Sequence, residues 1–270
     1  MTGNSNSTNK DRGPAPRFIL QPRDLHLERE LAILRVVDRE QAKIVAGFTS
    51  TTRANTRLLT LTRAGLLKRF FLGSGGGRKA LYSLSPQGAQ LVGVPYRGLR
   101  RRQDEILVAD FFIDHQLTVN ELYCTLKYKP IPIPGVTFNR WIAFHEQFTS
   151  AKSLIPDGYV ELGTPAGMVC SFLEVDLGHE GLAIWKEKGQ NYLQLAVSGN
   201  YHKQFGQERF RVLVLVNSER RLHSIRRTLA AMTEKIFWFA TLDAVRDNFF
   251  ATAWFRPASE QPKPFLEEHI

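Results

Sequence analysis

The sequence predicts an α+β protein built from two domains, and two observations support this prediction. Charge divides the 270-residue chain: residues 1–103 hold 19 Lys and Arg against 6 Asp and Glu, whereas residues 104–270 hold 17 against 20. The front half shows apolar residues at helical spacing, and the back half mixes helical segments with short apolar runs of strand length. A strongly basic front half indicates a polyanionic partner such as double-stranded DNA. The alternative is that a basic surface only aids solubility.

Composition narrows the class of protein further. The chain is 43% hydrophobic and 23% charged, which is typical of a globular protein. Residues 1–17 are polar and rich in Ser, Asn, Gly and Pro, so we expect a disordered tail without a signal peptide. No apolar run approaches the roughly 20 residues of a membrane helix. Cys124 and Cys170 lie far apart in apolar surroundings, which predicts reduced buried thiols and a cytoplasmic location.

Residues 18–98 have the pattern of a winged helix-turn-helix domain. Apolar spacing predicts helices over 23–37, 39–46 and 51–64, the last one beginning after Ser50 as its N-cap. Strands are expected at 66–71 and 81–84, joined by a basic, Gly-rich segment. A two-stranded hairpin that follows a helix-turn-helix is a wing, so we expect this half to bind DNA.

The third predicted helix has an apolar stripe and an opposite polar face. Ala54, Leu58 and Leu61 form the stripe. Side chains suited to base edges and phosphates lie on the polar face, at the wing tip and in the segment between the domains: Arg53, Thr56, Arg57, Thr60, Arg78, Lys79, Arg100, Arg101 and Arg102. The alternative interpretation of the helix face is a solvated polar surface.

Residues 99–256 predict a second domain with a mixed order of elements. We expect helices at 104–126, 180–197 and 219–232, and strands at 141–144, 159–162, 168–173, 210–216 and 236–241. The order α-β-β-β-α-β is the core of the restriction-endonuclease-like fold of the PD-(D/E)xK type. Residues 257–270 are expected to form a tail.

Three acids are expected to converge at one end of the predicted hairpin. Glu174 and Asp176 point the same way because strand side chains alternate, and Asp157 enters the neighbouring antiparallel strand. Carboxylates this close repel one another unless a positive charge lies between them. Mg²⁺, or Mn²⁺, prefers such oxygen ligands and can activate water and bind a phosphate. The alternative is a set of ordinary solvated acids.

The PD-(D/E)xK motif normally ends in a lysine that stabilises the charge developing on the phosphate. Here Asp176 occupies that position, and Lys188 on the following helix is the candidate replacement. Its helix face is largely apolar, where an ammonium is unfavourable unless it meets an acid. The alternative is a lysine that extends its charge into water. Glu146 is either a fourth acid or a solvated one, and His145 and His179 are interpreted as surface histidines.

Several short motifs occur in a characteristic order. They are Leu58-Leu59-x-Leu61-x-x-x-Gly65-Leu66-Leu67, Tyr82-Ser83-Leu84-Ser85-x-x-Gly88, Pro156-Asp157, Phe172-Leu173-Glu174-Val175-Asp176 and Lys188-x-x-x-Tyr192. Through them the chain, from about Leu20 to Leu242, resembles the replication-relaxation family of plasmids and other mobile elements. The resemblance implies DNA binding tied to replication, nicking or transfer, with a second copy or other replication and transfer proteins as partners.

Two functions from different classes remain open. In the first, a DNA-binding protein nicks DNA, with Asp157, Glu174 and Asp176 holding Mg²⁺ and Lys188 supporting the phosphate. In the second, a non-catalytic transcription or replication-control factor keeps a degenerate nuclease-like domain. The absence of a lysine at position 176 favours the second function. The three acids argue against it, because buried carboxylates without a function lower stability. A covalent tyrosine relaxase and an RNA-binding adaptor are disfavoured, since neither a histidine cluster nor an aromatic stacking platform is evident.

Overall fold

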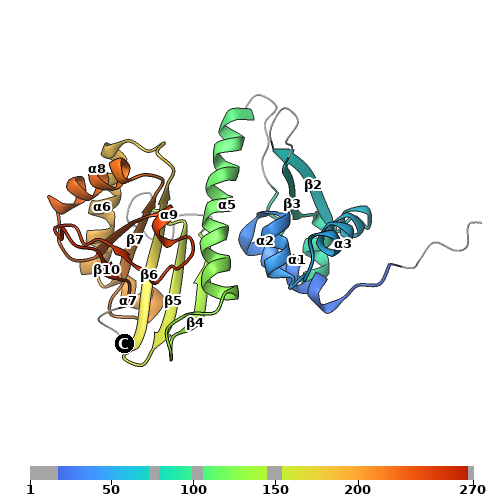
Figure 1. Ribbon diagram of the computed structural model, residues 1–270, viewed down its shortest axis with the longest axis horizontal. Coiled ribbons are helices and arrows are strands. Elements are labelled where there is room, and N and C mark those ends of the chain that lie inside the picture. The colour runs from blue at the N-terminus through green and yellow to red at the C-terminus, as the bar shows by residue number, and fades with distance from the viewer. Residues whose placement is uncertain (1–17, 73–78, 99–105, 145–153, 267–270) are drawn as a thin grey trace, which may run out of the picture.

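The computed structural model describes residues 18–72, 79–98, 106–144 and 154–266, and it confirms the mixed α+β class (Figure 1). We call residues 18–98 the N-terminal unit and residues 154–266, together with strand β4 (Thr137–Ile142), the sheet unit. The elements of the N-terminal unit are α1 (Pro22–Leu34), β1 (Val36–Asp38), α2 (Arg39–Val45), α3 (Thr51–Arg63), β2 (Leu67–Leu72), β3 (Lys79–Leu84) and α4 (Pro86–Val92). The strands form an antiparallel sheet in the order β1-β3-β2.

The N-terminal unit follows the predicted helices closely, with one correction. The first helix ends at Leu34 rather than at 37, because Arg35 takes a positive φ of 63° and the chain turns into β1. Val36 and Val37 then pair with Ser83 and Tyr82 of β3. Both valines are fully buried, so they continue the apolar spacing of α1 while belonging to the sheet. β-branched residues fit a pleated surface well, and the pairing with β3 decides their conformation.

Helix α3 forms as its sequence predicts. The Ser50 hydroxyl accepts a hydrogen bond from the backbone N–H of Arg53 at 3.2 Å, which satisfies one of the free amides of the first turn. Ala54, Leu58 and Leu61 are fully buried in the core of the N-terminal unit. The apolar stripe therefore orients this helix, and its polar face is left outward.

Helix α4, which was not predicted, explains the motif Ser85-x-x-Gly88. The Ser85 hydroxyl accepts from the Gly88 N–H at 2.9 Å and donates to the Gly65 carbonyl at 2.6 Å. A Cβ at Gly88 would lie 2.3 Å from the Leu66 carbonyl oxygen, closer than real atoms approach. The motif thus fixes α4 against the turn that joins α3 to β2.

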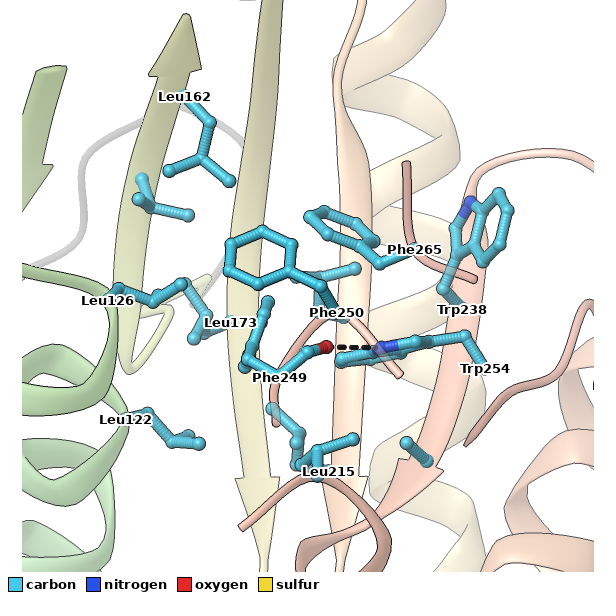
Figure 2. Packing of buried hydrophobic residues seen from close by; sticks show 14 of the residues in the cluster. Leu122, Leu126, Leu162, Leu173, Leu215, Trp238, Phe249, Phe250, Trp254 and Phe265 are labelled. Carbon is cyan, nitrogen blue, oxygen red and sulfur yellow. Dashed lines mark hydrogen bonds between the residues drawn. The ribbon is translucent and has the colours of Figure 1, made fainter. Parts of the chain in front are cut away.

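A long helix, α5 (Ile106–Tyr128), lies between the two units (Figure 1). Toward the N-terminal unit, the Asn120 side chain donates to the carbonyls of Leu34 and Val36 at 3.1 and 2.5 Å. The Gln41 side chain donates to the Leu117 carbonyl at 2.7 Å. On its other side, α5 packs apolar residues against the sheet unit, among them Leu122 and Leu126 (Figure 2). This helix is therefore part of both cores.

The sheet unit contains β4 (Thr137–Ile142), β5 (Gly158–Thr164), β6 (Gly167–Asp176), α6 (Leu182–Val197), α7 (Asn200–Phe205), β7 (Arg211–Val216), α8 (Glu219–Ala230), β8 (Phe237–Thr241), α9 (Leu242–Val245), β9 (Thr252–Trp254) and β10 (Lys263–Pro264). Five strands form one sheet in the order β4-β5-β6-β7-β8. The pairs β4·β5 and β5·β6 are antiparallel, whereas β6·β7 and β7·β8 are parallel. Helix α5 covers one face, and α6, α7 and α8 cover the other.

The prediction of a tail over 257–270 is wrong for the residues that the structure describes. Phe265 and Leu266 are fully buried, and Phe265 packs against Trp238, Phe249 and Trp254 (Figure 2). The Arg211 guanidinium of β7 donates to the Phe265 carbonyl at 2.6 Å and ties this segment to the sheet. Burying several aromatic side chains gives the segment a stabilising role that its polar composition conceals.

Two observations bear on the predictions of reduced buried thiols and of a chain without a membrane helix. Cys124 and Cys170 are free and buried, and burial raises the pKa of the Cys124 thiol to about 12. Within the described ranges, no helix combines the length and the apolar character needed to cross a bilayer.

Candidate functional site

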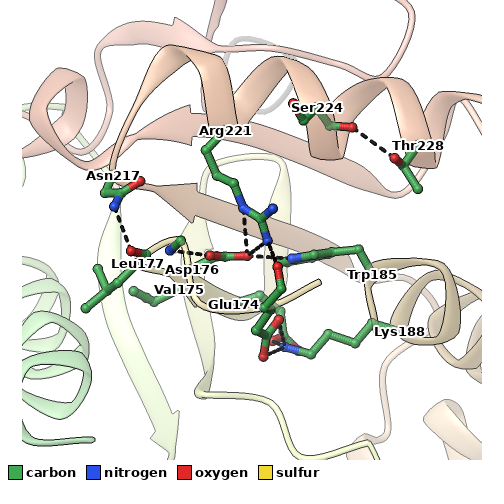
Figure 3. Close-up of polar contacts among 12 residues, drawn as sticks. Glu174, Val175, Asp176, Leu177, Trp185, Lys188, Asn217, Arg221, Ser224 and Thr228 are labelled. Atoms are coloured by element: carbon green, nitrogen blue, oxygen red, sulfur yellow. Dashed lines mark hydrogen bonds and ion pairs between the residues drawn. The ribbon is translucent and has the colours of Figure 1, made fainter. Parts of the chain in front are cut away.

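The strand order brings the three predicted acids to one end of the sheet. Asp157 directly precedes β5, whose first residue, Gly158, pairs with Leu173 of β6. Glu174 and Asp176 close β6, lie on the same face as predicted, and are each 1% exposed. Figure 3 shows that both side chains point toward α6 and α8. The three acids nevertheless have separate partners.

Asp176 is held by the protein on both of its carboxylate oxygens. Oδ1 accepts from the Gly178 N–H at 2.6 Å, and Oδ2 accepts from the Trp185 indole N–H at 2.6 Å (Figure 3). The Arg221 guanidinium, which reaches down from α8, also donates to Oδ2, with its Nε at 3.2 Å. A buried carboxylate with these donors is satisfied without any ligand.

Glu174 faces Lys188 and Tyr192 of α6. The Tyr192 hydroxyl donates to Oε1 at 2.6 Å, and the Lys188 ammonium lies 2.9 Å from Oε2. Lys188 also donates to both oxygens of Glu180 at 2.8 and 2.9 Å. Of the two alternatives for Lys188, the structure therefore shows the ammonium that meets acids. The geometry explains the motif Lys188-x-x-x-Tyr192, because two residues one turn apart bind one carboxylate.

For both Glu174 and Lys188, burial and the opposite charge of the partner shift the pKa in opposite directions. Burial raises the pKa of Glu174, and the nearby Asp157 charge adds to that rise, while Lys188 and Tyr192 oppose it. Burial also acts to lower the pKa of Lys188, but the charges of Glu174, Glu180 and Asp157 outweigh it and raise the pKa above its usual range. Lys188 therefore stays protonated and provides a permanent positive charge among these acids.

Asp157 has a partner that the sequence did not reveal. Its Oδ2 accepts from the Val175 N–H at 2.7 Å and lies 3.2 Å from Nε2 of His115 on α5. The same Nε2 lies 3.0 Å from the Val175 carbonyl oxygen. Burial acts to lower the pKa of His115, but the Asp157 carboxylate and the Val175 carbonyl outweigh it, so the pKa is raised. Sequence spacing gives no sign of this contact, because 42 positions separate the two side chains.

The predicted three-carboxylate metal site is not assembled. Across the described parts of the chain, no three His, Cys, Asp or Glu side chains lie where they could hold a metal ion together. The reason is that Arg221 and Lys188 supply the positive charge that we expected from a metal, and Asp176 is fully engaged by Arg221, Trp185 and Gly178. Asp157, Glu174 and Lys188 remain together without Asp176.

The predicted DNA-binding face of α3 is only partly free. Arg53 and Thr56 are exposed, and Thr60 is half-buried, with its hydroxyl donating to the Thr56 carbonyl at 2.8 Å. Arg57 instead ties α3 to α1: its Nε donates to buried Asp24 at 2.9 Å and its Nη2 to the Ile19 carbonyl at 2.6 Å. The Arg57 guanidinium therefore has internal partners, and its contact with DNA stays a prediction.

At the predicted wing, Lys79 has an internal partner, and three exposed cations nearby were not predicted. The Lys79 ammonium lies 2.6 Å from Asp38. Arg63, in the last turn of α3, and Lys68 and Arg69, on β2, are exposed cations that the prediction left out. Helical spacing from Thr56 to Arg63 could have identified Arg63. Arg78, Arg100, Arg101, Arg102, His145 and Glu146 lie outside the described residues, whereas His179 is exposed as expected.

Comparison with known proteins bears on the whole arrangement. The family model described as replication-relaxation matches residues 29–208 of the 270. The match runs from α1 through α7, and so includes α3, α5 and the acids of β5 and β6. No curated protein and no solved structure matches the chain. On the family match, the chain belongs to the replication-relaxation family.

Proposed function

We propose that this protein binds double-stranded DNA through its N-terminal unit and acts in the replication or relaxation of a plasmid or other mobile element. The family supports a role in replication or relaxation. The order α1, α2, α3 and then the β2–β3 hairpin supports a winged helix-turn-helix domain. Such a domain places one helix in the major groove and its hairpin on the backbone.

The outward face of α3 is the observation that carries this proposal. Its opposite face is fixed in the core by Ala54, Leu58 and Leu61, so Arg53, Thr56 and Arg63 are presented to solvent by a rigid helix. Arginine can bind guanine edges or phosphates through two parallel hydrogen bonds, and threonine can bind either. The excess of positive charge in residues 1–103 adds attraction for the phosphate backbone.

Fluorescence anisotropy with labelled duplex DNA tests this assignment. The variant Arg53→Ala/Arg63→Ala should weaken binding roughly 10-fold or more, since each lost contact costs about 1–3 kcal/mol. The matched control is Lys203→Ala/Arg209→Ala, which removes two exposed cations from the sheet unit. Equal weakening by both pairs would mean that net charge, rather than α3, binds the duplex.

The sheet unit supports a second candidate function, phosphodiester hydrolysis. Its element order, α5, β4, β5, β6, α6 and β7, supports a restriction-endonuclease-like core, and Asp157, Glu174 and Lys188 are retained together. Mg²⁺ is commonly bound through only one or two carboxylates with water, so Asp157 and Glu174 provide a sufficient donor set for Mg²⁺ or Mn²⁺. When bound, such an ion activates water and offsets phosphate charge. Lys188 would then stabilise the phosphate.

The competing role for the sheet unit is structural. The internal partners of Asp176 and Glu174 favour it, because both of these buried carboxylates are already paired. Supercoiled plasmid incubated with Mg²⁺, Mn²⁺ or EDTA separates the two roles. Metal-dependent conversion to open circles by the wild type and by Asp114→Asn, an exposed acid of α5, but not by Asp157→Asn, would establish hydrolysis. Binding without conversion would leave a DNA-binding factor with a degenerate nuclease-like domain.

A further inference from the structure

Helix α8 contains four arginines that divide into two pairs. Two of them point inward and have internal partners. Arg221 donates to Asp176 (Figure 3), and Arg226 donates to the Pro257 carbonyl at 3.0 Å and to the Ser259 carbonyl. These two side chains fix α8 on the sheet and on the C-terminal segment. The structure therefore accounts for Arg221 and Arg226.

The other pair points away from the fold. Arg220 and Arg227, with His223 between them, follow one another at three- and four-residue spacing and so share one face of α8. All three are exposed, and none of their side chains forms a hydrogen bond or ion pair with another described residue. We call these three residues the α8 basic face.

The cation at the N-terminal end of this face is unfavourable for the isolated helix, whereas Arg227, in the last turn, is favoured by the helix dipole. Arg220 lies in the first turn, where the positive end of the helix dipole disfavours a cation. It is also the direct neighbour of Arg221, and cations one or two turns apart on one face repel each other. Nothing in the packing of α8 requires these charges, since Leu222, Ile225 and Leu229 supply its buried stripe.

We propose that the α8 basic face binds the phosphate backbone of duplex DNA, a second contact that rests on the proposed DNA-binding function. Arginine presents a planar fork of donors that matches phosphate. Arg220 and Arg227 are separated by roughly 10 Å along the helix axis, at about 1.5 Å per residue, so their guanidinium groups can each bind a different phosphate. Ser224 and Thr228 lie along the same helix (Figure 3), but their hydroxyls donate to the carbonyls of Arg220 and Ser224 at 3.0 and 2.9 Å, so the two arginines carry the phosphate contact.

The position of this face makes it distinct from the α3 face. Figure 1 shows α3 and α8 at opposite ends of the molecule, with α5 between them. One short duplex seated on α3 therefore does not reach α8. The two faces bind distant stretches of one duplex, a geometry suited to a protein that organises DNA around a replication site.

Salt dependence of binding tests the α8 basic face directly. Anisotropy is measured with a duplex of about 40 base pairs over a range of NaCl concentrations for the wild type, Arg220→Ala/Arg227→Ala and the control Lys203→Ala/Arg209→Ala. The logarithm of the binding constant falls with the logarithm of salt by about 0.9 per phosphate contact. We expect the α8 variant to lower this slope by about two and to weaken binding roughly 10-fold at low salt, while the control stays near the wild type.

Other outcomes overturn the inference. A slope unchanged in the α8 variant would mean that this face serves another partner, such as an acidic protein, and does not contact DNA. Equal changes in both double variants would mean a diffuse charge effect. If Arg53→Ala/Arg63→Ala weakens binding and the α8 variant does not, only this inference fails. Absence of wild-type binding would overturn the proposed function together with it.

Discussion

The contact between Glu174 and Lys188 joins a buried carboxylate to an ammonium at the site proposed for hydrolysis. Glu174 is 1% exposed, and removing its cation leaves a buried carboxylate. We predict that Lys188→Met lowers the free energy of unfolding by roughly 3–5 kcal/mol, whereas Glu174→Leu/Lys188→Met stays near the wild type. The loss should grow with pH, because Glu174 can escape it only by protonation. Urea denaturation of both variants checks this, and a cost below about 1 kcal/mol for the single variant would contradict it.

Glu28 of α1 is a second buried carboxylate, and no described residue gives either oxygen a hydrogen bond. Burial, helped by the charge of Asp24, raises the pKa of Glu28 to about 7. A raised pKa means that the folded state retains the proton. The stabilisation is full below the unfolded value near 4.5 and is lost as pH rises through about 7.

The substitution Glu28→Gln should remove this pH dependence. We expect the wild type to lose about 1–3 kcal/mol relative to the variant between about pH 5 and pH 8.5. Urea denaturation at several pH values measures the difference. The matched control is Glu40→Gln, an exposed acid of α2. A difference between wild type and Glu28→Gln that does not vary with pH would mean that titration of Glu28 is not the cause.

At the scale of elements, sequence periodicity correctly predicted the features that depend on residues close together in the chain. The predicted helix 51–64 is α3 at Thr51–Arg63, and the face shared by Glu174 and Asp176 follows from strand alternation. Features that depend on contacts with residues far away in the sequence were not predicted. Val36 and Val37 form a strand only because β3 pairs with them, and the acid positions gave no sign that Arg221 would engage Asp176. Spacing identifies a face, but it does not identify what the fold brings to that face.

Helix α5 is the element on which the relation between the units depends. Asn120 is 1% exposed and is the hydrogen-bond donor to two carbonyls of the N-terminal unit. Asn120→Ala should cost about 1–3 kcal/mol, because buried carbonyls lose their donors. The control is Thr118→Ala, which removes a hydroxyl from the same helix. That hydroxyl donates only to the Asp114 carbonyl within α5. Equal costs for the two variants, measured by urea denaturation, would contradict a specific role for Asn120.

At the scale of the whole molecule, both units pack on α5. Its contacts with the N-terminal unit include those of Gln41 and Asn120, and its opposite side contributes Leu122 and Leu126 to the sheet core. A helix that belongs to two cores cannot leave one without disturbing the other. We therefore expect the units to unfold together, although their charges and proposed roles differ.

The distribution of tryptophan makes this coupling measurable. Of the four tryptophans, Trp185, Trp238 and Trp254 lie in the cores of the sheet unit, whereas Trp141 of β4 also packs against the core of the N-terminal unit, so the measurement uses a Trp141→Phe background. Leu58→Ala removes a fully buried side chain from the core beneath α3 and should cost about 2–5 kcal/mol. If the units unfold together, tryptophan fluorescence reports this loss as a lower urea midpoint that coincides with the one seen by circular dichroism. A tryptophan midpoint unmoved by Leu58→Ala would mean that α5 stays folded on the sheet while the N-terminal unit unfolds alone. In that case, a structural change caused by DNA binding at α3 would not be transmitted through α5 to the acids of β6.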